Sequence, residues 1–509
     1  QQQASSQAEG RATNENQSTI PWYSKYQGPI TIVLVLTIIG LVAALVAVLV
    51  NKNSSDNDGG SNKALAAPQP ASSPVDPPSI SFPTSRPTGT GQPTLLFEAT
   101  IKKLAPLSGE EVFKDNSSPQ YKAAKWIAEQ DLLDLDIDDP RFEQRYIMAL
   151  FYYAMDGDNW KQNQKWLSSK SECEWFGIDG FSAGCGGEDV GGCIKQSDDV
   201  GDYDRICRIG MGRLNNLYGQ IPSELGQLSE MRYIEIQDDY VTGTIPESLG
   251  SWTKLHTLLL GGNFLEGGFP ETFEDNEMLG TIFIDRNKFD GSFPNAIATL
   301  KNLEWLDAEN NTFVGTMPDG IGNLKSLRIL NVNNNSLTGY LPDSWDEKNA
   351  IEDFEVQDNK FRGPLPESLA KAKWLKDFRA SRNQLTGAIP TSYYGFESLE
   401  ELYLDENDFV GELPQTAEPF YGGLQELSIH SNKFSGRFPV EHFEDTLRIK
   451  VLSLHNNDLT GIISTNICDR RDASLAYTQL NVLTVDCDKM TCSCCTCYED
   501  GQLVTGTGS

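Results

Sequence analysis

Four carboxylates recur at a spacing of 24 or 25 residues in the second half of this 509-residue chain: Asp353, Asp377, Glu401 and Glu426. If that spacing is the repeat of stacked strands, these groups lie about 4.8 Å apart and repel one another. Such a row predicts a cationic ligand, a bound cation or neutralisation by a neighbour such as Arg379. A merely solvated acidic surface is the alternative, because the whole chain is acidic.

Histidines and serines suggest a second kind of chemistry. His430 and His455 continue a 25-residue spacing that starts at Asp405, and imidazoles stacked in this way could bind a metal or act as a pH switch. Two unrelated surface histidines are the simpler interpretation. Ser428 and Ser453 lie nearby, but no nucleophile elbow, Walker loop, dinucleotide fingerprint, kinase signature or HExxH motif accompanies them. We therefore predict no enzyme activity, no catalytic residues, no metal site and no cofactor.

The ten cysteines form two even groups. Even groups at the two ends of a domain are typical of disulfides made in an oxidising compartment. The stretch CSCCTC could instead bind a metal, but it lacks the paired C-x-x-C spacing and the nearby histidine of zinc sites. We expect disulfides among Cys173, Cys185, Cys193 and Cys207, and among Cys468, Cys487, Cys492, Cys494, Cys495 and Cys497.

Composition excludes one class of partner. Lys and Arg number 41 against 72 Asp and Glu, and the net charge of −31 would repel a phosphate backbone, so no nucleic acid is expected as a partner. With 39% hydrophobic residues, 44 Gly and 25 Pro, the chain is expected to be folded and rich in turns.

A repeat of 24 or 25 residues must position these groups, and its clearest mark is a ladder of asparagines with one Asp substitute. Aliphatic residues precede the ladder residue at alternate positions, as Leu258 and Leu260 precede Asn263. A glycine follows each ladder residue by four positions, and a proline follows nine of the ten glycines by three, which fits the template LxxLxxLxLxxNxLxGxIP. The ladder residues are Asp239, Asn263, Asn287, Asn311, Asn335, Asn359, Asn383, Asn407, Asn432 and Asn457.

Each part of the template has a physical reason. Alternate apolar residues point to one side of a short strand, the asparagine amide can bond backbone groups at the following bend, and glycine permits a tight turn. No single repeat can bury its apolar side, so the repeats must stack and be capped. The pattern predicts an α/β leucine-rich-repeat solenoid, a right-handed parallel β horseshoe with disulfide-closed caps.

The concave sheet is the default binding surface of a solenoid. Side chains six, four, two and one positions before each ladder residue are expected to face solvent there. Tyr233, Phe283 and Trp305 are therefore expected to be exposed aromatics, which suit a carbohydrate as well as a peptide. Besides the row of four carboxylates, the predicted ligand contacts are Glu355, Tyr403, Asp405 and Trp305.

An uncharged stretch of 21 residues, Ile30–Val50, is long enough to cross a bilayer as one helix. A cleaved signal peptide is the alternative, although its apolar region usually spans only about 7–15 residues. The cysteines, together with glycosylation sequons at Asn116, Asn310 and Asn334, predict that the following chain is extracellular or lumenal. We expect a single-pass protein of the plasma membrane or an endomembrane, with its N-terminus in the cytosol.

The predicted organisation follows from these features. It comprises a short cytosolic tail (1–29), a transmembrane helix (30–50), a disordered stalk rich in Pro and Ser (51–95), a helical N-terminal cap with cysteines (96–212), leucine-rich repeats of 24–25 residues (213–464) and a Cys-rich C-terminal cap and tail (465–509).

The GxIP ending and the repeat period resemble those of plant-type leucine-rich-repeat receptor-like proteins, and CEWFGIDG at Cys173 to Gly180 resembles their cap motif CxWxGVxC. The preceding stretch FEQRYIMALFYYAMDGDNWKQNQKWL and the run CSCCTC resemble the caps of membrane-anchored leucine-rich-repeat proteins common in diatoms. The likeness covers about residues 118–497 and implies an extracellular binding module. The chain departs from the receptor-like pattern in placing its apolar segment before the repeats and in showing no kinase domain.

These features predict a membrane-anchored extracellular recognition protein that binds a peptide, protein or glycan ligand on its concave sheet, with a co-receptor as a further partner. A structural or adhesive cell-surface protein, in which the solenoid is a rigid spacer, is the alternative function.

Overall fold

The computed structural model describes residues 93–177, 193–198, 201–415, 423–444, 448–470, 479–499 and 501–504, all within one compact unit, Ser85–Ser509. The predicted cytosolic tail, the predicted membrane helix at 30–50 and most of the predicted stalk lie outside the described residues. Helix α2 begins at Pro93, inside the range expected to be stalk. Among the helices of the described ranges, none is long and apolar enough to span a bilayer.

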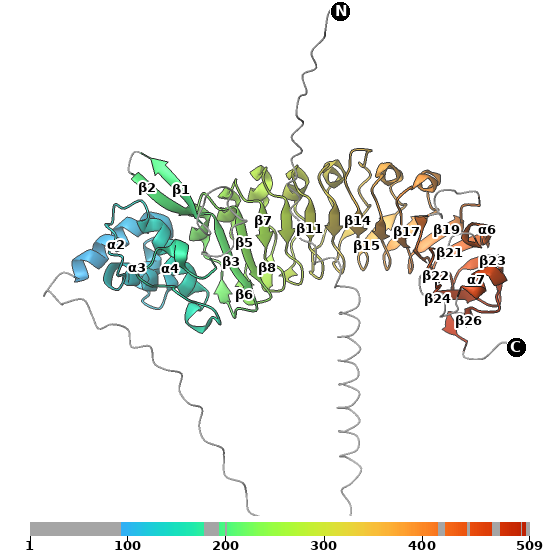
Figure 1. Cartoon of the computed structure of the whole chain (residues 1–509), viewed down its shortest axis with the longest axis horizontal. Coiled ribbons are helices and arrows are strands. Elements are labelled where there is room, and N and C mark those ends of the chain that lie inside the picture. The colour runs from blue at the N-terminus through green and yellow to red at the C-terminus, as the bar shows by residue number, and fades with distance from the viewer. Residues whose placement is uncertain are drawn as a thin grey trace, which may run out of the picture. The chain divides into compact units, whose positions relative to one another are not determined.

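The N-terminal cap is mainly helical and precedes the first repeat (Figure 1). Helix α4 contributes more buried hydrophobic residues to the core of the cap than any other of its elements, because residues on all its sides are buried, and it contacts both the first repeat and helix α3. Its elements are α2 Pro93–Ser108, η1 Glu111–Lys114, α3 Pro119–Glu129, α4 Phe142–Ala154, η2 Gly157–Asn159, η3 Glu172–Glu174 and the antiparallel hairpin of β1 Cys193–Asp198 with β2 Gly201–Ile206.

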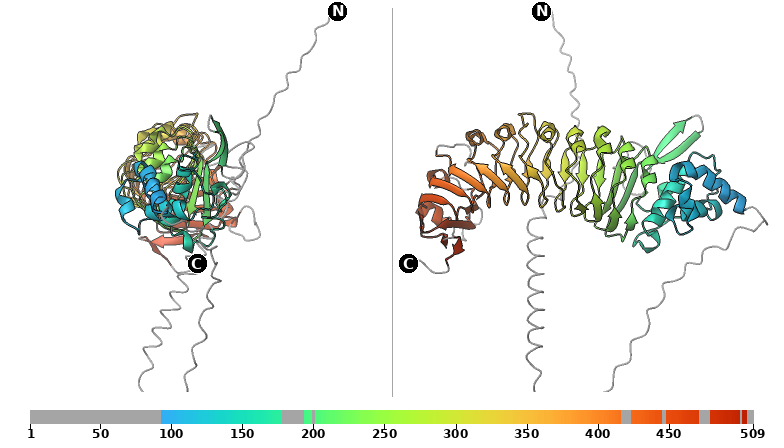
Figure 2. Two further views of the ribbon diagram at one scale, coloured as in Figure 1. Left: turned by 90° about the vertical axis from the view of Figure 1, so that its left-hand side faces the viewer. Right: turned by 180° about the vertical axis from the view of Figure 1, so that it is seen from behind.

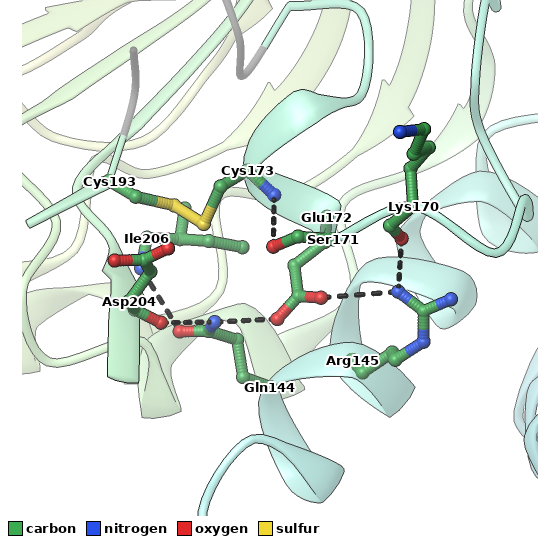
Figure 3. The surroundings of a disulfide bond; sticks show 9 residues. All are labelled: Gln144, Arg145, Lys170, Ser171, Glu172, Cys173, Cys193, Asp204 and Ile206. Carbon is green, nitrogen blue, oxygen red and sulfur yellow. Dashed lines mark hydrogen bonds and ion pairs between the residues drawn. A yellow bond between two sulfur atoms is a disulfide. The ribbon is translucent and has the colours of Figure 1, made fainter. Parts of the chain in front are cut away.

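A fully buried ion-pair network holds the cap together next to a disulfide (Figure 3). The Arg145 guanidinium donates to Asp131 Oδ1 at 2.6 Å and to Glu172 Oε2 at 3.2 Å, and the adjacent Cys173 is bonded to Cys193. Gln144 donates to the other oxygen of Glu172 at 2.7 Å. Because every charge here has a partner, this cluster is structural rather than a ligand site.

The repeats form a parallel sheet of 14 strands, with a final antiparallel strand at its C-terminal edge (Figures 1 and 2). This confirms the predicted leucine-rich-repeat solenoid, and the sheet continues beyond residue 464 into β24 and β26. Its strands are β3 Arg208–Arg213, β5 Tyr233–Gln237, β7 Thr257–Leu259, β9 Thr281–Phe283, β11 Trp305–Asp307, β12 Ile329–Asn331, β14 Asp353–Glu355, β16 Asp377–Arg379, β18 Glu401–Tyr403, β20 Glu426–Ser428, β22 Val451–Ser453, β24 Val482–Asp486, β26 Thr496–Glu499 and β27 Gln502–Leu503.

Two further parallel sheets follow the ladder residues. They are β4 Tyr218–Gln220, β6 Tyr240–Gly243, β8 Phe264–Gly267 and β10 Lys288–Phe289 in one, and β13 Thr338–Gly339, β15 Lys360–Gly363, β17 Gln384–Gly387, β19 Asp408–Glu412, β21 Lys433–Arg437, β23 Asp458–Ile462 and β25 Met490–Thr491 in the other. The glycine that ends many of these strands takes a left-handed conformation, as Gly387 does at φ 85°.

Short 3-10 helices complete the coils on the side away from the 14-stranded sheet. A proline precedes each of those in the repeats, with φ between −57° and −73°, which suits a helix start that needs no N–H donor. They are η4 Ser223–Gln227, η5 Glu247–Ser251, η6 Glu271–Asp275, η7 Asn295–Thr299, η8 Asp319–Asn323, η9 Glu367–Lys371 and η10 Thr391–Gly395, followed by the α-helices α6 Glu441–Glu444 and α7 Thr465–Asp469.

The ladder asparagines form the predicted internal polar row. Asn359 donates its side-chain amide to the carbonyl of Val332 in the preceding coil at 2.9 Å and to the carbonyl of Val356 at 3.2 Å, and its Oδ1 accepts from the Leu337 amide at 2.9 Å. The equivalent bonds recur at Asn263 and along the array. Each asparagine therefore ties two coils together and satisfies backbone groups that would otherwise be buried without partners.

The C-terminal cap is closed by three disulfides, Cys468–Cys494, Cys487–Cys497 and Cys492–Cys495. In the N-terminal cap Cys173 is bonded to Cys193, Cys207 is also disulfide-bonded, and Cys185 lies outside the described residues. No cysteine in the described part of the chain is free.

Candidate ligand-binding face

The 14-stranded sheet aligns side chains of successive repeats into columns, which we name by their position before the ladder residue. In the minus-six column, strand register pairs Asp353 with Asp377, Asp377 with Glu401, and Glu401 with Glu426. All four side chains are half-buried. The structure therefore brings the predicted carboxylates side by side on four adjacent strands.

Arg379 neutralises the middle of this row. Its guanidinium lies 2.9 Å from Asp377 Oδ2 and 2.6 Å from Glu401 Oε2, and it stacks over the ring of Tyr403 at 5.0 Å from the centroid. Tyr403 in turn donates its hydroxyl to Glu426. Two of the predicted carboxylates therefore have a cationic partner within the protein, and the Tyr403 hydroxyl is engaged.

Asp353 is different, because no side-chain hydrogen bond or ion pair to it is formed by the described residues. Burial raises its pKa to about 6, with the nearby charges of Glu355 and Glu352 acting in the same direction. Asp353 therefore lacks the direct counter-ion that Asp377 and Glu401 have in Arg379.

Other predicted contacts occupy less accessible positions. Asp405 is only 4% exposed, and its Oδ1 accepts from the Ser381 hydroxyl at 2.8 Å. The expectation that Phe283 is exposed is wrong: the side chain is 6% exposed, because it packs edge-to-face against Trp305 at 5.0 Å between ring centroids. Trp305 itself is half-buried at the surface of the sheet.

Sequence reasoning found Glu355 but missed the group of acidic and amide side chains to which it belongs, which spans three adjacent repeats and ends in the repeat of β14, the strand of Asp353. Aligning the minus-four and minus-two columns would have revealed them, because five carboxamide or carboxylate residues follow Asp307 there without a cation. We call this group the acceptor cluster; its members are Asp307, Glu309, Asn331, Asn333, Glu355 and Gln357.

The carboxylates of the acceptor cluster are held by amides rather than by cations. Asn331 donates to Glu309 Oε2 at 3.0 Å, and Asn333 donates to Glu355 Oε2 at 2.8 Å. Burial raises the pKa of Asp307 well above its ordinary value, and the charges of Asp285 and Glu309 add to that effect. Burial also raises the pKa of Glu309. The cluster thus concentrates negative charge where ionisation is unfavourable.

The two histidines stack on each other and on the C-terminal cap. The ring centroids of His430 and His455 lie 4.5 Å apart, and those of His455 and Tyr498 lie 3.8 Å apart. Burial, together with the charge of His430, lowers the pKa of His455 to about 4. His455 Nδ1 lies 2.8 Å from the Thr484 hydroxyl oxygen, so this ring is held in a hydrogen-bonded stack.

Two groups in the described ranges bring three potential metal-ligand atoms within 4.8 Å of one another. Cys468, Cys492 and Cys494 form one, but their sulfurs are in disulfides and offer no thiolate. The second is the exposed Glu406 with Asp405 and His430, where Arg382 lies 4.0 Å from Asp405 and competes electrostatically with a metal.

The three sequon asparagines lie at different kinds of position. Asn116 is exposed in the N-terminal cap. Asn310 and Asn334 occupy neighbouring coils directly before ladder residues, and the Asn334 amide donates to Asn310 Oδ1 at 2.6 Å. Glycans at these two positions would flank the acceptor cluster.

Comparisons with known proteins agree with this architecture. Family models described as leucine-rich repeats match residues 253–313 and 326–347. The comparison with curated proteins found no match. The chain contains leucine-rich repeats, and its structure is similar to the ectodomains of plant leucine-rich-repeat receptors.

One similar structure is the plant peptide hormone receptor RGFR1 in complex with RGF2, which is 25% identical with a TM-score of 0.50 over 56% of this chain and 47% of that chain. A TDR receptor is 26% identical with a TM-score of 0.48 over 55% of this chain and 51% of that chain. A plant ice-binding protein is 22% identical with a TM-score of 0.48 over 63% of this chain and 94% of that chain. The chain thus matches about half the length of the two receptor structures.

Proposed function

We propose that this chain is a membrane-anchored recognition protein that binds a cationic peptide segment along the polar face of its 14-stranded sheet. The observation that carries this proposal is the in-register row of carboxylates from Asp353 to Glu426, which continues into the acceptor cluster. Neighbouring carboxylates on strands about 4.8 Å apart are stabilised by a ligand that brings positive charge.

The similarity to a plant peptide hormone receptor supports a peptide over a glycan as the ligand. An extended peptide can cross several strands and place successive side chains against successive repeats. A co-receptor that contacts the peptide and the solenoid together is a further proposed partner.

The anchor is assigned to Ile30–Val50, with the repeats on the extracellular or lumenal side. The uncharged length of this segment supports the anchor. The disulfides of both caps support an oxidising compartment.

The test uses the full chain in detergent micelles and a phage-displayed library of random nonapeptides. We expect selection of peptides rich in Lys and Arg. Their binding should be lost in a variant that combines Asp353→Asn, Asp377→Asn, Glu401→Gln and Glu426→Gln, because these isosteric changes remove charge and keep side-chain shape.

A matched control removes four charges from exposed carboxylates on the side of the 3-10 helices: Glu247→Gln, Glu277→Gln, Asp319→Asn and Glu367→Gln. This control should bind selected peptides as the unmodified chain does. Equal loss in both variants would show a non-specific charge effect. A library that yields no binder to the unmodified chain would favour the rigid-spacer function instead.

A further inference from the structure

The acceptor cluster contains more hydrogen-bond acceptors than donors. The amides of Asn333 and Gln357 both point their nitrogens at Glu355 Oε2, at 2.8 and 3.4 Å. Their own oxygens, Asn333 Oδ1 and Gln357 Oε1, are buried and accept no hydrogen bond. The Asn333 side chain is 8% exposed, so the lack of a hydrogen-bond donor to its Oδ1 destabilises the folded state.

The negative charge of the acceptor cluster is also uncompensated. In the described part of the chain, no Lys or Arg forms an ion pair with Asp307, Glu309 or Glu355. Arginines on these and the flanking repeats pair with other carboxylates. Arg286 pairs with Asp285 and Asp238, Arg328 with Glu352, and Arg379 with Asp377 and Glu401. Asp307 and Glu309 on one repeat and Glu355 two repeats further on therefore have no cationic partner among the described residues, and a ligand that carries positive charge and several N–H donors could supply one.

The spacing of these carboxylates distinguishes between kinds of cation. Calcium binds oxygens at about 2.3–2.6 Å, so its ligand atoms must converge to within roughly 5 Å of one another. The acceptor cluster is not among the groups of described residues in which three such atoms lie within 4.8 Å. A guanidinium group is larger, is planar, and carries five N–H donors that reach acceptors farther apart.

An aromatic ring lies beside the cluster. Trp305 is on the same strand, β11, as Asp307, and it is half-buried with part of its surface accessible. Guanidinium groups stack on indole faces, whereas ammonium groups are more strongly hydrated and offer only three donors. The site therefore favours an arginine side chain over a lysine side chain.

We propose that the acceptor cluster is a subsite for an arginine side chain of the bound peptide, with Glu309 and Glu355 receiving the guanidinium and Trp305 covering it. This inference rests on the proposed function and specifies one residue type of its ligand. It adds a contact that lies outside the predicted row of carboxylates.

The experiment measures binding of the pentapeptide acetyl-Gly-Gly-Arg-Gly-Gly-amide to the deglycosylated full chain in detergent micelles by ligand-observed NMR. Matched pentapeptides carry lysine or citrulline, which is the uncharged counterpart of arginine. We expect the arginine pentapeptide to bind at least about tenfold more tightly than the citrulline pentapeptide, and more tightly than the lysine pentapeptide, because charge-assisted and bidentate hydrogen bonds are lost.

Glu309→Gln should weaken binding of the arginine pentapeptide about tenfold or more, whereas Glu367→Gln on the opposite side of the coil should leave it unchanged. Thermal melting of both variants checks folding, and Glu309→Gln is expected to melt no lower than the unmodified chain, because it removes a half-buried charge that has no cationic partner among the described residues.

Three results would overturn the arginine subsite: no binding of the arginine pentapeptide up to about 10 mM, equal binding of the citrulline pentapeptide, or full binding to Glu309→Gln. Displacement of the pentapeptide by millimolar calcium chloride would reassign the cluster to an inorganic cation. If the fourfold variant from Asp353 to Glu426 still loses binding of library peptides while the arginine pentapeptide gives one of these results, the arginine subsite is wrong and the proposed function is retained.

Discussion

The guanidinium of Arg379 lies 2.6 Å from the carboxylate of Glu401 on the neighbouring strand. This ion pair divides the acidic face into two parts. The part around Glu401 is largely neutralised from within the protein, and the part from Asp307 to Asp353 is not. A cationic ligand therefore gains more from the second part, because there it does not compete with a resident arginine.

Replacing Arg379 tests whether it is a structural counter-ion. Arg379→Met leaves Asp377 and Glu401 half-buried without a partner, and we expect the free energy of unfolding to fall by about 2–4 kcal/mol. Adding Asp377→Asn and Glu401→Gln to this variant should recover most of the lost free energy of unfolding. Urea denaturation followed by circular dichroism measures both; Arg362→Met, an exposed arginine on a neighbouring repeat, is the control with little expected change.

Neutralising Asp307 should stabilise the protein. The raised pKa of Asp307 means that the folded state holds this proton to higher pH than the unfolded state does. Protonated Asp307 contributes stability that is fully present below the pKa of Asp307 in the unfolded state, near 4. This stability is lost as pH rises through the pKa of Asp307 in the folded state. Asp307→Asn should therefore melt higher than the unmodified chain at pH 8, with a gain of about 1 kcal/mol, and nearly equally at pH 4. A larger difference in melting temperature between the variant and the unmodified chain at pH 4 than at pH 8 would contradict the interpretation that Asp307 carries an uncompensated charge.

Binding of a cationic peptide should depend on the ionisation of Asp353. Because its pKa is about 6, this carboxylate is mostly charged at pH 7.5 and mostly protonated at pH 5. We expect selected cationic peptides to bind more weakly at pH 5, and we expect Asp353→Asn to reduce the ratio of the two affinities. Fluorescence anisotropy at both pH values measures this ratio. An unchanged ratio in the variant would place the pH-sensitive contact elsewhere.

Replacing a ladder asparagine should lower the free energy of unfolding. Asn359→Ala removes one of the two side-chain amides that donate to the Val332 carbonyl and leaves the Leu337 amide without its acceptor, and we expect the free energy of unfolding to fall by about 2–4 kcal/mol. Asn302→Ala, which removes an exposed amide that donates to the Glu277 carbonyl, should lower the free energy of unfolding by less than about 1 kcal/mol. Hydrogen exchange should show faster opening of the coils around Leu337 in the first variant. If Asn359→Ala and Asn302→Ala lowered the free energy of unfolding by similar amounts, the internal asparagine row would not be what joins the coils.

The repeat architecture could be predicted from the sequence because each coil carries the information for its own turn. Leu258, Leu260 and Asn263 occupy the positions that one strand and one bend require, and the same positions recur along the chain. Stacking such coils leaves little choice of sheet order, and the structure shows the expected parallel sheet.

The properties of the acidic face were less predictable. Asp405 accepts a hydrogen bond from the Ser381 hydroxyl 24 residues earlier, and Phe283 packs against Trp305 on the next strand, so the burial of both side chains involves contacts between repeats. Reading a single column of carboxylates pointed to Asp377 and Glu401, which Arg379 neutralises. It passed over Asp307 and Glu309, because their significance comes from the absence of a cation on neighbouring strands.

Taken alone, the sequence determined the repeat length, the internal asparagine row and the sheet on which Asp353, Asp377, Glu401 and Glu426 align, because these follow from backbone geometry that recurs every 24 or 25 residues. Only the tertiary structure decided which cysteines pair, which carboxylates Arg379 reaches and which amide oxygens are left without donors. Those outcomes depend on side-chain conformations and lateral distances of a few ångströms between coils, and a linear pattern of residue types does not specify them.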